Sequence, residues 1–201
     1  MTPEIRWRII SLQVVMVAVL AFCAGVGYWA FNYTHDQVST QLREQQITFP
    51  AANSPALKAL PASDASAMTT YAGQQMTTGD QAHTYAQNFI AVHLKEIGAG
   101  KTYSYYSGKA LAEEQSNPKQ YAIDNGIALT LFRGETLRSL LLNAYAFWFV
   151  GTLALYAAIG LTVAAVVVFG ALLFELLVAP KREGVIETAP RTGRAKAVPM
   201  A

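Results

Sequence analysis

Two long apolar runs dominate the hydropathy pattern of this chain. The first extends from Ile9 to Phe31 without a charged side chain, and the second extends from Leu140 to Ala179 with Glu175 as its only charge. A helix needs about 20 apolar residues to cross a hydrocarbon core of about 30 Å. Both runs exceed that length, so the pattern predicts a membrane protein with two transmembrane helices.

The second run is about twice as long as one crossing requires. A hairpin of two short spans would need a polar or Gly/Pro turn near its middle, where the sequence offers only Gly160 and Thr162. Neither residue carries a charge that would hold a turn in water. We therefore favour one long helix whose first turns stand outside the bilayer, and the hairpin is the alternative.

The polar segment between the two runs also has helical signals. The first helix is expected to continue to about Gln46. Thr78 or Asp80 can cap a later helix, which carries an apolar stripe at helical spacing and can end at Gly98. A shorter helix is expected over residues 103–114.

Two stretches of this segment have no helical pattern. Residues 48–68 hold three prolines among alanines and serines, which predicts an extended linker. The stretch "EEQSNPKQ" predicts a loop centred on Pro118. A last helix is expected from about Ala128, continuing into the second span without a break.

These elements predict an all-α membrane protein, in which two transmembrane helices carry a small external helical region on long projecting helices. The region has a thin core and no disulfide, so partner proteins are expected to complete its packing. The predicted segments are a cytoplasmic N-terminus (1–8), a first transmembrane helix (9–33), the external region (34–138), a long helix containing the second transmembrane helix (139–179) and a basic, disordered cytoplasmic tail (180–201).

Charge is scarce and unevenly placed. Charged residues make up 14% of the chain, against about 25% in ordinary soluble domains. Lysines and arginines gather before the first span, at Arg6 and Arg8, and after the second span, from Lys181 onward. Cytoplasmic flanks carry such an excess, so we expect a multi-pass protein of the plasma membrane with both termini cytoplasmic. The basic tail favours contact with anionic lipid.

The first run has a second interpretation, as a cleaved signal peptide. Its apolar segment is longer than the roughly 7–15 residues of a signal-peptide core, and no small-residue cleavage site follows it. We therefore expect it to remain as a span.

Residues suited to catalysis are few and dispersed. His83 and His93 are ten residues apart on one predicted helix, too far to share a metal ion, and we expect both to be solvated. Cys23 is the only cysteine, which leaves no internal disulfide. No phosphate-binding loop or catalytic triad is recognisable. We expect a protein that is not an enzyme, with no cofactor or metal and no nucleic-acid partner.

Small residues predict where the two spans touch. Close helix approach in lipid favours small side chains, and Glu175 is expected to face protein, with Arg8 or Ser11 as its partner. The alternative is an interfacial carboxylate that reaches water. The predicted helix–helix or partner contacts are Arg8, Ser11, Ala18 and Gly25 on the first span and Ala157, Gly160, Ala164, Ala171 and Glu175 on the second.

Two stretches resemble a known family. "YAGQQMTTGDQAHTYAQNFIAVHL" and "TLFRGETLRSLLLNAYAFWFVGTLALYAAIGL" are similar to a small actinobacterial membrane-protein family with two spans, a short external helical region and a basic tail. Some members carry a ring-opening dioxygenase label. The chain lacks the histidine and carboxylate cluster that such an enzyme needs, so we reject that activity.

The layout also resembles accessory or association-factor subunits of the actinobacterial respiratory supercomplex, which joins a cytochrome bc complex to an aa3-type cytochrome oxidase. This resemblance implies a non-catalytic accessory or assembly subunit, with other membrane-protein subunits and lipid as partners. The alternative is an envelope membrane protein whose external helices bind a lipid or a periplasmic factor.

The orientation can be tested with one introduced thiol. In a Cys23→Ala background, a Ser66→Cys variant should react with a membrane-impermeant thiol reagent in intact cells, because residues 34–138 are expected outside. A cysteine placed in the tail should react only after lysis. If the tail cysteine alone is labelled in intact cells, the predicted orientation is reversed.

Overall fold

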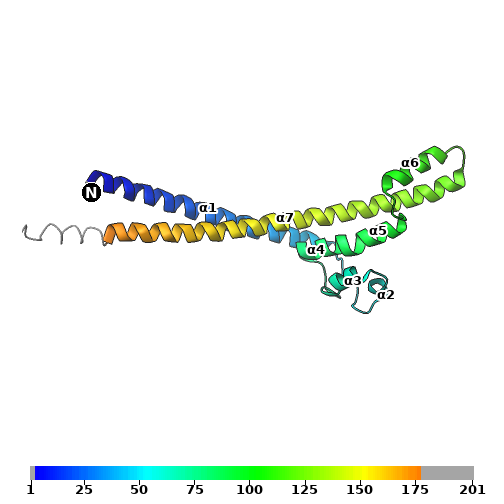
Figure 1. Cartoon of the computed structure of the whole chain (residues 1–201), viewed down its shortest axis with the longest axis horizontal. Coiled ribbons are helices and arrows are strands. Elements are labelled where there is room, and N and C mark those ends of the chain that lie inside the picture. The colour runs from blue at the N-terminus through cyan, green and yellow to red at the C-terminus, as the bar shows by residue number, and fades with distance from the viewer. Residues whose placement is uncertain (1–2, 178–201) are drawn as a thin grey trace, which may run out of the picture. The chain divides into compact units, whose positions relative to one another are not determined.

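The computed structural model describes residues 3–177 (Figure 1), and the predicted tail lies outside this range. The described chain is all-α, as predicted: it contains no strand, and its single β-bridge joins Thr48 to Gln75. In order, the elements are α1 (Pro3–Glu44), α2 (Pro55–Lys58), α3 (Ala62–Thr69), α4 (Gly79–Tyr85), the π-helical segment η1 (Ala86–Ile90), α5 (Ala91–Ile97), α6 (Tyr103–Glu113) and α7 (Pro118–Leu177).

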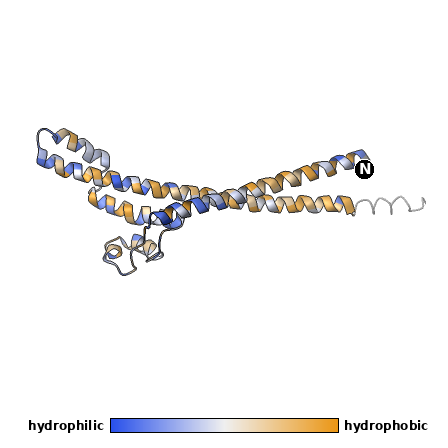
Figure 2. Ribbon diagram, turned by 180° about the vertical axis from the view of Figure 1, so that it is seen from behind, coloured by the Kyte–Doolittle hydropathy of each residue, from blue (hydrophilic) through white to orange (hydrophobic). Residues whose placement is uncertain are grey.

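The two long helices, α1 and α7, are both long and apolar enough to cross a membrane. Figure 2 shows consecutive turns of apolar residues along each of them. Only 11% of the most apolar window of each helix is buried in the structure. A core helix of a soluble protein would bury most of such a window, so these surfaces need an apolar environment outside the chain.

The second apolar run is one continuous helix as far as Leu177. The hairpin alternative is therefore wrong for this range. The helix also starts ten residues earlier than expected, at Pro118. Asn117 accepts a hydrogen bond at its Oδ1 from the backbone N–H of Gln120 (3.3 Å), and proline fits the first helical turn because no hydrogen bond is required of its nitrogen. The predicted loop thus contains a helix start.

The predicted extended linker at 48–68 is also wrong. Ser54 accepts a hydrogen bond from the backbone N–H of Leu57, and α2 begins at Pro55. Pro61 directly precedes α3. Prolines therefore start helices here rather than extend the chain, and the segment buries Leu57 and Met68.

The predicted capped helix is present but not uniform. Thr78 caps α4 in a capping box with Gln81, and α5 ends at Gly98. Between them lies η1, where the Ala91 N–H bonds to the Ala86 carbonyl, one residue further back than in an α-helix. The apolar stripe of the predicted helix did not indicate this π-helical segment. The shorter predicted helix corresponds to α6, whose bounds agree within one residue.

The described chain divides into a smaller unit, residues 3–27 and 156–177, and a larger unit, residues 28–155. The larger unit holds the main core, in which helices α2 to α5 pack with parts of α1 and α7. Phe49 is fully buried, with its ring centroid 5.4 Å from that of Tyr71 and 5.3 Å from that of Tyr85. The buried cluster is Val38, Leu42, Phe49, Leu57, Leu60, Met68, Met76, Ala82, Ala86, Ile90, Leu94, Leu131 and Leu141.

The contact of α4 with α7 depends on Gly79. A Cβ at this position would overlap Cβ of Trp148, an atom that cannot move without moving the helix. Gly79→Ala is therefore expected to lower the free energy of unfolding by about 1–3 kcal/mol, the usual cost of overpacking. The thermal midpoint of the full chain in mild detergent, followed by circular dichroism, measures the change.

Gly126→Ala is the matched control, because a Cβ there meets no atom within 4 Å. It lies inside α7, where alanine stabilises a helix by about 0.8–1.0 kcal/mol relative to glycine. Equal midpoints for the two variants would contradict the close approach of Gly79 to Trp148.

Candidate functional site

In the smaller unit, α1 and α7 meet along a face with a seven-residue repeat. Ile10 and Ala24 are buried on α1, and Ala158, Ala165 and Leu172 are buried on α7. Two helices that keep such a repeat in contact follow the geometry of an antiparallel coiled coil. The predicted contacts Ser11, Ala18 and Gly25 have the same seven-residue spacing.

On each helix, predicted contact residues lie one residue away from these buried positions. Ser11 and Gly25 follow the buried positions of α1, whereas Ala157 and Ala171 precede those of α7. Ala18 and Gly160 are likewise exposed, and Ala164 is half-buried. One residue is about 100° of helix rotation, enough to turn a side chain out of the contact. That these residues contact a partner chain remains a prediction.

Size alone did not select the buried face. A Cβ at Gly25 or Gly160 would meet nothing within 4 Å, so neither glycine marks a close approach. The buried face instead includes bulky Ile10 and Leu172 as well as alanines. The small-residue stripe therefore does not coincide with the buried face.

Glu175 is half-buried, but its expected partners do not contact it. The guanidinium of Arg6 donates a hydrogen bond of 2.7 Å from Nη2 to the backbone carbonyl of Glu175. Arg8 and Ser11 are exposed and make no such bond among the described residues. Arg6 lies one helical turn before Ile10 and therefore shares the face of α1 that packs on α7. This position explains why Arg6, and not Arg8, contacts Glu175.

In the larger unit, His35 joins α1 to α7. Its ring centroid lies 3.8 Å from that of Trp148, and its Nε2 lies 3.4 Å from the hydroxyl of Thr152. A Cβ at Gly151 would overlap the Thr34 hydroxyl. Glycine at this position thus allows the two helices to approach closely enough for the histidine contact.

The other two histidines are half-buried, not solvated as expected. The ring of His83 packs on that of Tyr145 at 4.4 Å, and Nδ1 of His93 lies 2.7 Å from the Phe89 carbonyl. Each histidine therefore has a structural contact of its own. Over residues 3–177, no three His, Cys, Asp or Glu side chains converge to hold a metal ion.

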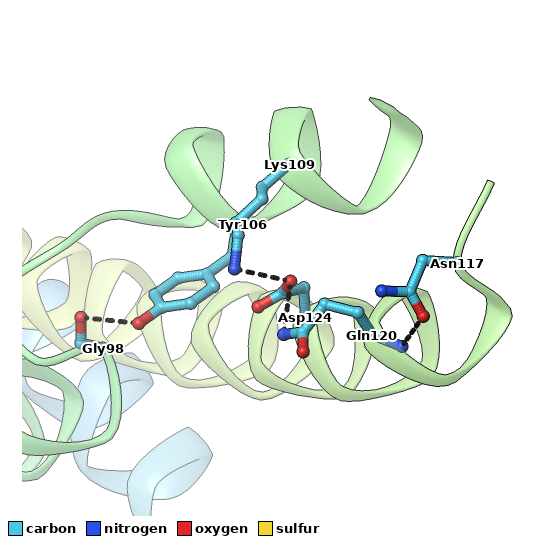
Figure 3. Close-up of polar contacts among 6 residues, drawn as sticks. All are labelled: Gly98, Tyr106, Lys109, Asn117, Gln120 and Asp124. Carbon is cyan, nitrogen blue, oxygen red and sulfur yellow. Dashed lines mark hydrogen bonds and ion pairs between the residues drawn. The ribbon is translucent and has the colours of Figure 1, made fainter. Parts of the chain in front are cut away.

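A polar cluster fastens α6 to α7 (Figure 3). The Asp124 carboxylate is buried, with 2% of its side chain exposed, and its Oδ2 lies 2.9 Å from Lys109 Nζ. Gln120 donates a second hydrogen bond of 2.9 Å to the same oxygen. Nearby, the Tyr106 hydroxyl donates to the Gly98 carbonyl at 3.3 Å. A buried carboxylate needs such partners, so the cluster fixes how α6 packs.

Glu113 makes this cluster sensitive to pH. Hydrogen bonds from Gln120 and Lys109 lower the pKa of Asp124, whereas burial, and then the contact with Asp124, raises the pKa of Glu113. Oε2 of Glu113 is buried without a hydrogen-bond partner. A proton on Glu113 would let this carboxyl donate to Asp124 and would remove the repulsion between the two acids.

Sequence reasoning missed this cluster for one reason. Lys109 and Glu113 were expected on one helix at a spacing that places them on one face. Asp124, however, lay outside both predictions, between the end of the predicted loop at Gln120 and the expected start of the last helix near Ala128. The asparagine before Pro118 was the available signal for the earlier start.

A groove lies between α1 and α7 in the larger unit, and we name it the α1–α7 groove. Its volume is about 490 Å³, and it is lined by six residues of α1 between Tyr33 and Leu42, by Gln45 just after the end of α1, and by six residues of α7 between Leu137 and Phe147. None of these lining residues is charged. The lining is mainly apolar, with glutamine amides along one edge.

A second cavity, of about 390 Å³, opens beside the start of α6. It includes Lys101 and Arg138, but both cations have contacts within the fold. Lys101 lies over the Tyr105 ring at 5.4 Å, and Arg138 contacts Glu135 at 3.2 Å and Gln87 at 2.9 Å. These contacts make it a weaker candidate for a site than the α1–α7 groove.

The acid pair predicts how the stability of the α6–α7 contact depends on pH. Ionised Asp124 stabilises the contact above its ordinary pKa, and this stabilisation is lost as pH falls through its lowered pKa in the folded protein. Protonated Glu113 stabilises the contact below its ordinary pKa, and this stabilisation is lost as pH rises through its raised pKa in the folded protein. The contact should therefore be strongest between the two shifted pKa values.

Glu113→Gln should remove the loss of stability at higher pH, because the amide N–H of glutamine can donate to Asp124 at every pH. Hydrogen-exchange protection of the α6 amides, corrected for intrinsic exchange, should stay constant in this variant as pH rises to neutral, whereas the wild type loses protection. Glu114→Gln, at an exposed neighbouring position, should behave as wild type. A wild-type profile for Glu113→Gln would refute the role of Glu113.

Comparison of the chain with protein-family models, curated proteins and solved structures found no match.

Proposed function

We propose that this protein is a non-catalytic accessory or assembly subunit of a larger membrane complex. One observation carries the proposal: large apolar side chains are exposed on the helices beyond the two apolar runs. Phe132 of α7 is 53% exposed, and its ring centroid lies 5.6 Å from that of Tyr103 of α6, which is 43% exposed. In water, a cluster of such side chains is a surface that another protein covers.

The polar groups support a structural role. Lys109 and Asp124 hold α6 on α7, His35 holds α1 on α7, and Arg138 bridges α7 to Gln87 of η1. Each of these groups is engaged in helix packing. Catalytic groups, in contrast, need access to a substrate and a partner that activates them.

The membrane placement is part of the proposal. Both apolar helices would lie in the plasma membrane, with the termini in the cytoplasm and residues 34–138 outside. The lysines and arginines at the two ends support this orientation. The basic tail would contact anionic lipid.

The specific complex we propose is the actinobacterial respiratory supercomplex, with cytochrome oxidase and cytochrome bc subunits as partners. Its support is the resemblance in size, span number and layout. The rival is an envelope protein whose external helices bind a lipid or a periplasmic factor, since the same exposed apolar side chains could serve that purpose.

Purification of the tagged full chain in mild detergent tests the proposal. Haem-containing oxidase subunits are expected to co-elute, seen by their absorption spectrum and by mass spectrometry. A preparation that contains this chain without haem proteins would overturn the respiratory assignment and favour the rival.

A matched pair of variants locates the surface. Phe132→Glu should reduce the recovery of partner subunits at least about tenfold, the effect of losing a central apolar contact. Thr130→Glu changes an exposed hydroxyl on the same helix and should leave recovery unchanged. Equal recovery with both variants would place the contact elsewhere.

A further inference from the structure

The α1–α7 groove reaches the apolar runs of both long helices. The first run ends at Phe31, just before Tyr33, which lines the groove. On α7, the lining residues from Leu140 to Phe147 lie inside the second run. Exposed aromatic side chains mark this end of the groove, as they mark a membrane–water interface: Tyr28, Trp29 and Tyr33 on α1 and Phe147 on α7. With both runs in the bilayer, this end of the groove opens toward the membrane.

The size of the groove favours a slender occupant. From Tyr33 to Gln45, the chain rises about 18 Å at the helical spacing. A further helix about 10 Å wide would occupy about 1,400 Å³ over this length, nearly three times the groove volume of about 490 Å³. An extended peptide is narrower, but its backbone N–H and C=O groups need hydrogen bonds that an apolar floor does not supply. A hydrocarbon chain is narrow and needs none.

Two further hollows continue from the groove around α7. Leu140 lines both the groove and a hollow of about 330 Å³ that also touches Tyr103 and Phe132. Tyr103 and Glu135 in turn line both that hollow and the cavity beside the start of α6. The three spaces therefore share lining residues in series within the larger unit, and we name them together the α7 track.

The end of the α7 track furthest from the apolar runs is cationic. Its cavity is lined by Lys95, Lys101 and Arg138 and by one carboxylate, that of Glu135, which gives the lining a net charge of +2. Glu135 pairs with Arg138, and the ring of Tyr105 attracts Lys101 without cancelling its charge. The cavity alone is a weak site, but the two lysine charges remain available to an anion whose other part is held in the groove.

We propose that the α7 track binds an anionic lipid, with its head group in the cationic cavity and a hydrocarbon chain in the α1–α7 groove. The two ends of such a molecule match the two ends of the track, and its chain points toward the membrane, as in a bilayer. A neutral lipid would leave the lysines without a partner, and a small soluble anion would leave the groove empty. The inference rests on the membrane placement proposed above but not on the accessory role, because a lipid can be held inside or outside a larger complex.

Photolabelling of the full chain in native membranes tests the track. The probe is a long-chain fatty acid with a diazirine in its chain, and its methyl ester is the matched probe without the charge. Mass spectrometry of peptides should find the fatty acid on residues 33–45, which lie beyond the first apolar run. The ester should label these residues about three- to tenfold less, the effect of losing two exposed ion contacts. Labelling is expressed relative to lipid-facing residues of the apolar runs, which both probes reach.

One pair of variants tests the groove. Asn143→Trp narrows it at an exposed lining position, and it should lower labelling of residues 33–45 by the fatty acid at least about tenfold, because the chain loses its place. Ala146→Trp is the matched control, since Ala146 is exposed and does not line the groove. It should label as the wild type does.

A second pair tests the cationic end. Lys95→Ser combined with Lys101→Ser should lower labelling by the fatty acid to the level of the ester and should leave labelling by the ester unchanged. Lys58→Ser combined with Lys119→Ser makes the same change of charge at exposed positions that do not line the track, and it should have no effect.

Two results with the wild type would overturn the lipid site, whatever the variants do. One is label confined to lipid-facing residues of the apolar runs, which would leave the groove without a lipid. The other is equal labelling of residues 33–45 by the fatty acid and the ester, which would show that the lysines do not select the head group. Co-elution of haem proteins with a chain that takes up no label in the groove would contradict the lipid site and leave the accessory role standing. Label in the groove without haem proteins would do the reverse.

Discussion

The packing of α1 against α7 is the contact on which the other elements depend. Within the smaller unit it uses a seven-residue repeat, and within the larger unit it uses close approach at Gly151 together with the His35–Trp148 contact. A straight helix has 3.6 residues per turn, so only a regular repeat of complementary side chains keeps two such long helices in contact. Helices α4 to α5 then pack on α7, and α6 is held on it by a buried carboxylate.

Long elements could be predicted because their signals are local and repeated. The two apolar runs, the Thr78 cap and the end at Gly98 all follow from helix chemistry within a few residues. The prolines at 55 and 118 were taken as signs of a linker and a loop, but each one starts a helix. A proline stops a preceding helix from continuing through it, and it also favours the first turn of a new helix. Sequence composition does not distinguish these roles, whereas the side chain just before each proline does.

The candidate site was harder to predict because it depends on rotation and on distant partners. A stripe of alanines and glycines indicates the period of a helix contact but not its phase, and the buried face includes bulky Ile10 and Leu172. Asp124 and Lys109 are joined across a turn whose position was misjudged. The groove is formed by helices more than ninety residues apart in sequence, and no local pattern marks it.

The π-helical segment has a consequence for chain length. It holds one residue more than an α-helix would need over the same rise, so α5 is turned by about 100° relative to an uninterrupted helix. That rotation lets Leu94 reach Gly134 of α7. A related chain one residue shorter between Thr78 and Gly98 would present a different face of α5 to α7. Such a chain must therefore carry compensating changes near position 134, so the length of this segment and the size of that residue should vary together through evolution.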